Sequence, residues 1–188
     1  MRHFSHLYGL YPAALFTGEP EVLAAARRSL DRRLAHGSGH TGWSAAWAAN
    51  LYARLGDGAA AHTALRQLQA RSTLPNLLGD HPPFQIDGNF GYVAAVAELL
   101  LQSHAGEVQV LPARPPAWPD GEVRGLRARG GLSVDFAWRG GELTHLAVRA
   151  TVPYRGTLRA AGRTFPLDLG ADERAELLSR PPHHKEPT

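Results

Sequence analysis

The hydrophobic period changes once along the 188-residue chain, near Ala105 and Gly106. Before that point, apolar residues recur every three to four positions, which is the repeat of amphipathic helices. After it, apolar and polar residues alternate, which is the repeat of half-buried strands. The sequence therefore predicts a multidomain chain, with a helical part followed by a strand-rich part.

The expected helices span residues 19–36, 43–55, 57–71 and 91–104. Asp57 is placed to cap the third helix, and Asn89 stands where it would cap the fourth. A long loop over 73–90 separates these two helices. Loops of this length inside a compact domain are usually functional or disordered, and the aromatic and apolar content of this one argues against disorder.

The alternating part contains a short strand at 108–111 and longer runs at 121–129, 131–138, 143–151 and 156–165. The sequence Arg-Gly-Gly-Glu at 139–142 is typical of a hairpin turn. We accordingly expect a helical domain over 1–105, a small antiparallel β-sandwich over 106–175 and a disordered tail over 176–188.

Composition excludes several classes of function. The chain has no cysteine, so disulfides, thiolate nucleophiles and cysteine-type zinc sites are excluded. Lys+Arg 20 against Asp+Glu 17, with no basic run beside aromatic residues, does not indicate nucleic-acid binding. No apolar run is long enough to span a membrane. A signal peptide is not visible, and the compartment stays open.

Polar and aromatic residues are concentrated in three segments, 2–8, 37–44 and 81–91. Each stands at a helix start or in a loop, where rigid scaffolds place functional groups. In the third segment, Asn89 is equally well explained as a helix cap. Asp87, in a loop rich in Pro and Phe, would be partly desolvated if that loop is buried, and such a carboxylate needs a partner or a task.

The other two segments supply candidate partners for that carboxylate. Arg2 offers a planar, permanently charged group, and His3 can donate or accept near neutral pH. The Trp43 ring has two interpretations, stacking on a sugar or packing in the core beside Trp47. His40 either lines a pocket or caps a helix. The histidine spacings match no zinc motif, so we expect no metal.

At these segments the chain resembles glycoside hydrolase family 95. The resemblance rests on Arg-His-Phe-Ser-His-Leu-Tyr-Gly-Leu-Tyr-Pro (2–12), Gly-His-Thr-Gly-Trp-Ser-Ala-Ala-Trp (39–47), Ser-Thr-Leu-Pro-Asn-Leu (72–77), His-Pro-Pro-Phe-Gln-Ile-Asp-Gly-Asn-Phe-Gly (81–91), Leu-Leu-Gln-Ser-His-Ala-Gly-Glu (100–107), Leu-Pro-Ala (111–113) and Ala-Trp-Pro-Asp-Gly (117–121). These segments extend over most of residues 2–138, and their order makes the resemblance far more specific than one short motif.

The resemblance implies the C-terminal part of an (α/α)6-barrel catalytic domain, followed by a β-sandwich. It also implies an inverting hydrolase that removes terminal α-L-fucosyl, or α-L-galactosyl, groups from glycans without a cofactor. In the family an aspartate polarises the asparagines that activate water, and it corresponds to Asp87. Arg2 and His3 correspond to substrate-contacting positions. We assign substrate binding also to the side chains His40, Trp43, Phe84 and Gln85.

In the family, the general acid and the asparagines precede the segment that matches 2–12. We therefore expect the chain to be inactive alone and to have two partners, a fucosylated glycan and an N-terminal part of the catalytic domain. Without the other barrel helices, the inner faces of Leu30, Trp47 and Leu65 should lack their full set of packing partners. Two alternatives remain: a non-catalytic carbohydrate-binding or structural module, and a tetratricopeptide-like interaction protein, for which no second repeat aligns.

Overall fold

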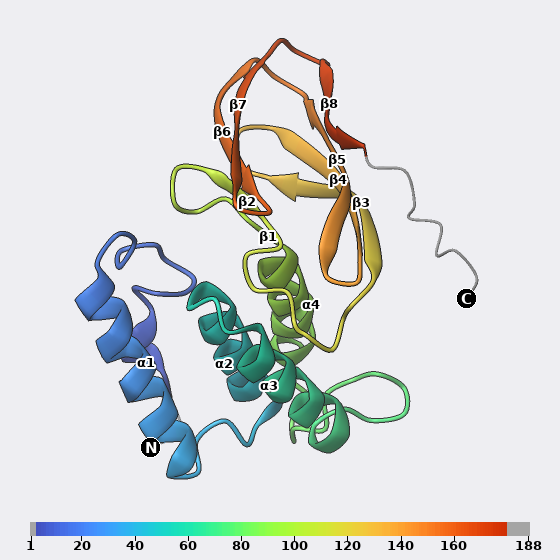
Figure 1. The fold of residues 1–188 in the computed structure, drawn as a ribbon. Coiled ribbons are helices and arrows are strands. Elements are labelled where there is room, and N and C mark those ends of the chain that lie inside the picture. Colours follow the sequence, from blue (N-terminus) through green and yellow to red (C-terminus); the bar gives the residue numbers. More distant parts are fainter. Residues whose placement is uncertain (1–2, 180–188) are drawn as a thin grey trace, which may run out of the picture. The chain divides into compact units, whose positions relative to one another are not determined.

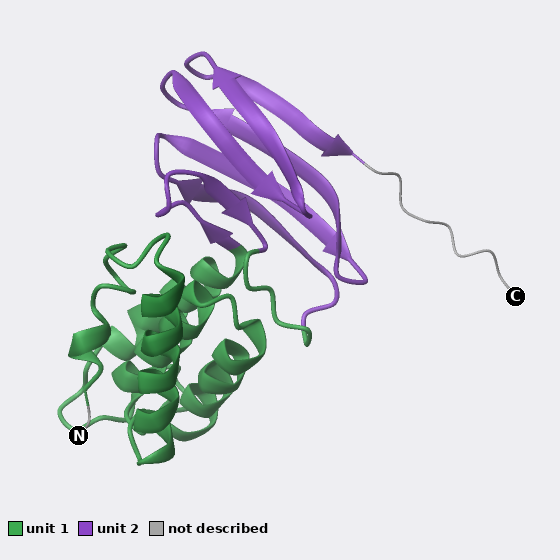
Figure 2. Ribbon diagram, turned by 60° about the vertical axis from the view of Figure 1, so that its left-hand side comes forward, with its two compact units in different colours: residues 1–100, 112–117 green, residues 101–111, 118–188 purple. Residues whose placement is uncertain are grey.

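A computed structural model describes residues 3–179, and these form two compact units (Figures 1 and 2). The helical unit holds the residues up to 100 and also 112–117, and the strand unit holds 101–111 and those from 118 on. Residues 112–117 belong with the helices because Ala113 is buried and its N–H donates to the Leu99 carbonyl. The chain thus crosses between the units more than once, unlike a single division after residue 105.

The helical unit contains a 3-10 turn and four helices within the described residues: η1 Ser5–Leu7, α1 Pro20–Ala35, α2 Gly42–Arg54, α3 Gly58–Arg71 and α4 Asp87–Leu100. The first three helices lie within one residue of the predicted bounds. Asp57 caps α3 as expected, since its Oδ1 accepts a hydrogen bond from the Ala60 N–H at 2.8 Å. None of these helices is long and apolar enough to cross a bilayer.

Helix α4 differs from the prediction, because it begins at Asp87 instead of residue 91 and ends at Leu100. Asp87-Gly88-Asn89 has the composition of a turn, yet it forms the first helical turn, and the Phe90 N–H donates to the Ile86 carbonyl. Asn89 is therefore not the cap of α4. Its Nδ2 reaches back to the Leu77 carbonyl at 2.6 Å and holds the preceding loop.

The core of the helical unit is centred on α2, which packs against both α3 and α4. This helix is rich in alanine, and residues 44–46 and 48–53 are buried. The expectation that Leu30 and Leu65 lack their full set of packing partners is wrong, because they are 0% and 2% exposed. The residues of this unit suffice to cover them. Trp47 is half-buried.

Small residues bring α4 close to α2. A Cβ added at Gly91 would stand 2.8 Å from the Cβ of Ala46, and one added at Gly88 would stand 3.2 Å from the backbone of Gly42. Such distances leave no room for a side chain. The first turn of α4, which carries Asp87, is thus held against the start of α2, which carries Trp43.

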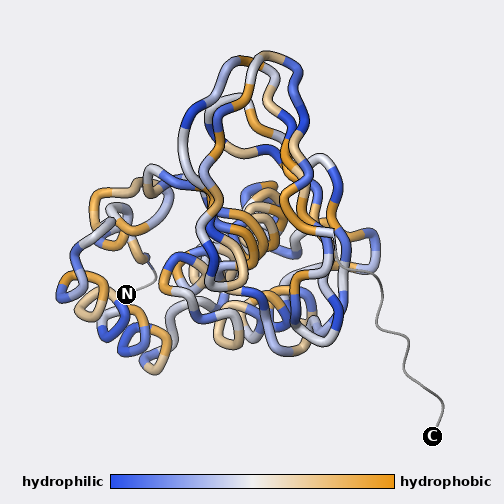
Figure 3. Tube along the Cα trace, turned by 45° about the horizontal axis from the view of Figure 1, so that its top comes forward, coloured by the Kyte–Doolittle hydropathy of each residue, from blue (hydrophilic) through white to orange (hydrophobic). Residues whose placement is uncertain are grey.

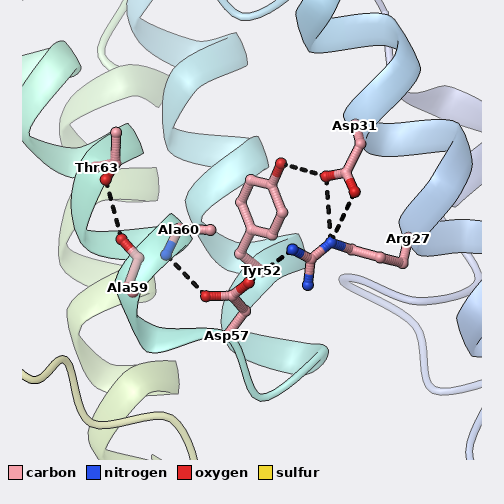
Figure 4. Close-up of polar contacts among 7 residues, drawn as sticks. All are labelled: Arg27, Asp31, Tyr52, Asp57, Ala59, Ala60 and Thr63. Carbon is pink, nitrogen blue, oxygen red and sulfur yellow. Dashed lines mark hydrogen bonds and ion pairs between the residues drawn. The ribbon is translucent and has the colours of Figure 1, made fainter.

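A polar network ties α1 to the α2–α3 turn (Figure 4). Arg27 pairs with Asp31 on its own helix at 2.9 Å and with Asp57 at 2.8 Å. The Tyr52 hydroxyl donates to Asp31 at 2.7 Å, and the Arg27 guanidinium lies over the Tyr52 ring. Burial and the hydrogen bond to Asp31 raise the pKa of Tyr52, so this hydroxyl stays protonated as a donor.

The strand unit contains two four-stranded sheets within the described residues. One sheet has the order β1-β2-β6-β7, with bounds Leu101–Gln102, Val108–Val110, Tyr154–Ala160 and Arg163–Leu169. The other has the order β3-β4-β5-β8, with bounds Gly121–Ala128, Leu132–Arg139, Glu142–Ala150 and Arg174–Ser179. The predicted hairpin turn joins β4 to β5 at Gly140 and Gly141, both with positive φ.

Three expectations for the strand unit need correction. The run 156–165 is not one strand, because Ala161 and Gly162 both have positive φ and turn the chain from β6 into β7. The sheets are not wholly antiparallel, since β2 pairs with β6 in parallel. Residues 176–179 are not a disordered tail but part of β8, which pairs with β5. Residues 180–188 lie outside the described part.

The core of the strand unit follows the predicted alternation. Along β4, the residues Leu132, Val134, Phe136 and Trp138 are buried, and their neighbours are more exposed. Figure 3 shows hydrophobic and hydrophilic stretches interleaved along the chain trace. The burial of every second side chain explains why this part of the sequence carries a period of two.

Candidate active site

A cleft of about 360 Å³ opens on the helical unit between α2, α4 and the segment 8–12 that follows η1. It is lined by the aromatic side chains Tyr8, Tyr11, Trp43 and Trp47, together with Pro12, Asn50, Asp87 and Gly91. We call it the aromatic cleft. Its wall is mostly apolar ring surface, and the side chains of Asn50 and Asp87 are the non-aromatic polar groups among the described lining residues.

The aromatic rings of the cleft are held by one another and by the segment before α1. His3 stacks on Trp43 with ring centroids 5.3 Å apart. Trp43 in turn meets Trp47 at 6.4 Å, and Trp47 donates from its indole N–H to the Tyr11 carbonyl at 3.0 Å. Trp43 therefore packs beside Trp47, as one interpretation of its sequence position expected, and it also lines the cleft.

Arg54 holds in place the segment 8–13, which we call the tyrosine-bearing segment. It is 4% exposed and binds both carboxylate oxygens of Glu98 on α4, at 2.6 and 3.0 Å. Its remaining donor, Nη1, reaches the carbonyls of Leu10 and Ala13, and its guanidinium lies over the Tyr11 ring. One side chain thus joins α2, α4 and the wall of the cleft. Burial, and then the Glu98 charge, raise the pKa of Tyr11, so its hydroxyl stays neutral.

Asp87 stands at the first residue of α4 and lines the aromatic cleft. We expected the Asp87 carboxylate to be desolvated if its loop is buried, but Asp87 is exposed in this structure. A carboxylate in the first helical turn is favoured by the helix dipole, which contributes about 0.3–1 kcal/mol at an exposed position. Asp87 therefore has a structural explanation in addition to any role in chemistry.

Gln85 lies at a second cleft, of about 420 Å³, which we call the loop cleft. Trp43 lines both clefts, and the loop cleft also contains His81, Asn89 and Phe90. The loop above it is ordered by hydrogen bonds between Leu74 and Leu78 and from Asp80 to Ser72. Phe84 lines neither cleft and is exposed. The structure thus brings Trp43 together with Asp87 on one side and with Gln85 on the other.

His40 is placed elsewhere. It lines a third cavity, with Leu34, Tyr52 and Arg71, and its Nδ1 hydrogen-bonds to the Gly37 carbonyl at 2.9 Å. His40, which we assigned to substrate binding, therefore does not line the aromatic cleft with Asp87. The hydrogen bond explains the difference, because it folds the imidazole back onto the turn that precedes α2.

Two further predictions were that Arg2 contacts the substrate and that the histidines hold no metal. Arg2 lies outside the described residues. Across residues 3–179, no three acidic or histidine side chains gather closely enough to hold a metal ion. His6 bonds the Ser29 hydroxyl at 2.8 Å, which links η1 to α1, and burial followed by Arg33 lowers its pKa.

Sequence reasoning did not single out Tyr8, Tyr11, Asn50 or Arg54. The two tyrosines stand inside the quoted segment 2–12, so their place in a polar-aromatic cluster was visible. Asn50 stands inside the helix predicted over 43–55, and its sequence position gave no sign of a role at a cleft. Nothing local distinguishes Arg54, because its partners Leu10 and Glu98 are each 44 residues away.

The aromatic cleft combines flat ring surfaces with a few polar groups. Flat aromatic surfaces accept the apolar faces of a sugar ring, and a few polar groups fix its orientation. Asp87 is the one carboxylate among the described residues that line it. A helical unit with such a cleft, followed by a strand unit, is compatible with a carbohydrate-active protein, and the comparisons with known proteins identify the class.

Two family patterns match the chain in succession. The Glycosyl hydrolase family 95 catalytic domain matches residues 1–100, and the Glycoside hydrolase family 95, C-terminal domain matches residues 102–176. The chain belongs to glycoside hydrolase family 95.

Curated relatives carry fucosidase names. The chain is 39% identical to alpha-L-fucosidase 2 of Arabidopsis thaliana over 89% of its own length and 22% of the relative's. It is 38% identical to the probable alpha-fucosidase A of Aspergillus oryzae, over 73% of this chain and 22% of that protein. The corresponding protein of Aspergillus niger is 33% identical over 73% and 20%. The chain thus spans about a fifth of the length of these relatives.

Proposed function

We propose that this chain forms one wall of the active site of an inverting hydrolase that removes terminal α-L-fucosyl, or α-L-galactosyl, groups from glycans. The observation that carries the proposal is the meeting of Asp87 with Trp43 and two tyrosines in one cleft of a family 95 chain. The rings would receive the sugar. The helical unit would then be the C-terminal part of an (α/α)6 barrel.

Inversion needs an acid that protonates the leaving oxygen and a base that activates water on the opposite face of the sugar. In this proposal Asp87 polarises the groups that activate water, while Trp43 and the His3 ring stacked on it contact the sugar. A single carboxylate cannot stand on both faces. The proton donor therefore comes from residues other than those that line the cleft here.

An exposed apolar surface supports a partner for the helical unit. Phe90 and Val93, three residues apart on α4, are each 67% exposed, and Leu77 in the adjoining loop is 73% exposed. Large apolar side chains gathered on one face indicate a contact surface. We propose that the upstream part of the catalytic domain covers them and brings the acid to the aromatic cleft.

Complementation tests this proposal. The chain is mixed with a separate polypeptide carrying the upstream region of a family 95 catalytic domain, and release of L-fucose from 2′-fucosyllactose is measured. We expect activity from the mixture, its loss with Asp87→Asn and its retention with Asp172→Asn, a matched exposed carboxylate in the strand unit. Equal activity of the two variants would exclude Asp87 from the reaction.

A carbohydrate-binding module without chemistry is the second candidate, and the single carboxylate of the cleft favours it. This candidate predicts that sugar binds to the chain while the complemented mixture stays inactive. The same two measurements therefore separate the candidates.

A further inference from the structure

Asn50 presents a buried amide at the aromatic cleft. It lies on α2, is 1% exposed and is one of the residues that line the cleft. Its Nδ2 donates to the carbonyl of Ala46 at 2.8 Å and to that of Gly91 at 2.9 Å. Because both partners are carbonyl oxygens, which only accept, the amide cannot be turned over without losing both bonds.

This arrangement leaves the Asn50 Oδ1 without a hydrogen-bond partner anywhere in residues 3–179. A buried carbonyl oxygen without a donor is uncommon in native proteins, and each one needs an explanation. The residue is fixed by α2 and α4, so its oxygen cannot move away to find a protein donor. The remaining source of a donor is the cleft itself, from a bound ligand or from an ordered water.

We infer that Asn50 Oδ1 accepts a hydrogen bond from a hydroxyl group of the sugar that occupies the aromatic cleft. The inference rests on the proposed function and adds a specificity-determining residue to it. An amide oxygen binds only hydrogen-bond donors, so it would bind a hydroxyl group of the sugar. The apolar faces of the sugar would instead lie against the rings of Trp43 and Tyr11. A site built to hydrogen-bond a hydroxyl rejects an analogue that lacks it, because the buried acceptor is then left unpaired.

Nuclear magnetic resonance of the isotope-labelled chain tests this without a substitution. L-fucose is titrated to millimolar concentrations while the Asn50 Cγ and Nδ2 signals and the indole signals of Trp43 and Trp47 are followed. We expect all of them to shift with one dissociation constant. Asn89 is the matched control, because its Nδ2 also binds a carbonyl and its Oδ1 is also buried without a described partner, but it lines the loop cleft.

Analogues of L-fucose that each lack one hydroxyl identify the donor. One of them should leave the Asn50 Cγ unshifted while still moving the indole signals, and should bind about tenfold more weakly. Indole shifts without any Asn50 response to L-fucose would overturn the inference and leave the proposed function intact. An Asn50 response that survives every deletion would assign the contact to water and overturn it. Silence from all these signals would count against both.

Discussion

At the residue scale, Arg54 is the side chain on which the aromatic cleft most depends. It is nearly fully buried and all its hydrogen bonds are to Glu98 and to two backbone carbonyls of the tyrosine-bearing segment. Breaking a buried ion pair from one side leaves the other charge uncompensated, which is far more costly than losing a surface pair. The geometry of the cleft wall is therefore coupled to the stability of the α2–α4 contact.

We predict that Arg54→Ala lowers the free energy of unfolding by about 3–5 kcal/mol. The measurement is denaturant unfolding followed by the helical circular dichroism signal. Arg66→Ala, at an exposed arginine of α3, is the control and should change little. The double variant Arg54→Met with Glu98→Leu should recover part of the loss, since no buried charge is left alone. A loss for Arg54→Ala no larger than that of the control would contradict the prediction.

The network around Arg27 gives a second prediction at this scale. Tyr52→Phe removes the donor to Asp31 but keeps the ring beneath the guanidinium. One hydrogen bond to a charged group contributes about 1.5–3 kcal/mol, and half-exposure of Asp31 places this one at the lower end. Hydrogen exchange of α1 amides should show faster opening in the variant. Unchanged exchange in α1 would mean that the Tyr52 hydrogen bond does not hold this helix.

At the scale of elements, the close approach of α2 and α4 positions Asp87 beside Trp43. It depends on residues without side chains at the contact, and Gly91 is the tightest of them. Gly91 also supplies a carbonyl that holds the Asn50 amide. A change at this position should therefore alter packing and cleft together.

We predict that Gly91→Ala destabilises the chain by about 1–3 kcal/mol, although alanine is the better helix former by about 1 kcal/mol. The added Cβ would meet Ala46, which belongs to the buried core. Gly42→Ala is the matched control, because a Cβ there would make an ordinary contact with Ser72 at 3.5 Å. If thermal unfolding shows Gly91→Ala to be stabilised, the helices are less tightly packed than described.

In the strand unit, Asp135 connects three strands. Its Oδ1 accepts from the Gly125 N–H at the irregularity of β3, and its Oδ2 accepts from Arg174 of β8. Burial acts to raise its pKa, but the bonds from Arg174 and Gly125 outweigh it, and the pKa of Asp135 is lowered. A hydrogen bond from Arg159 likewise lowers the pKa of Glu107.

Because these pKa values are lower in the folded state, their stabilisation is complete above the unfolded values, 3.8 and 4.5, and is lost as pH falls through the folded ones. We predict that amide exchange of β4 and β5, corrected for its intrinsic pH dependence, shows weakening of the strand unit in acid. Asp135→Asn should lower stability by about 1–3 kcal/mol at neutral pH and flatten this dependence. Asp172→Asn should do neither, and an unchanged acid response in Asp135→Asn would contradict the assignment.

The elements also show what sequence can predict. Helices α1, α2 and α3 follow from periodicity and from local stops such as Gly37 and Gly56. The start of α4 was missed because Asp-Gly-Asn is usual in turns, and here close packing of Gly88 against α2 overrides that preference. The parallel pairing of β2 with β6 joins Val108 to Leu158, and no local pattern encodes so distant a contact.

The site was predictable to a similar extent. Asp87 and Trp43 were selected from the density of polar and aromatic groups, and the structure places both at one cleft. His40 came from the same reasoning but bonds its own turn. The roles of Arg54 and Asn50 depend on partners 41–44 residues away, so only the folded structure reveals them.

At the scale of the whole molecule, the helical unit has two contrasting properties. Its interior is well packed, as the burial of Leu30 and Leu65 shows, while Phe90 and Val93 on α4 lie exposed. The first property indicates that the chain can fold by itself. The second, together with a cleft that has one carboxylate, underlies our proposal that catalysis needs a further part of the catalytic domain.

Assay of the purified chain alone for L-fucose release from 2′-fucosyllactose tests that proposal most directly. General acid–base groups contribute typically ~10²–10⁴-fold each, so a cleft without the acid and without the water-activating asparagines should show no enzymatic turnover. We predict equal inactivity of the unmodified chain and of Asp87→Asn. Robust turnover by the unmodified chain that disappears in Asp87→Asn would contradict the proposal and would place an unrecognised acid within these 188 residues.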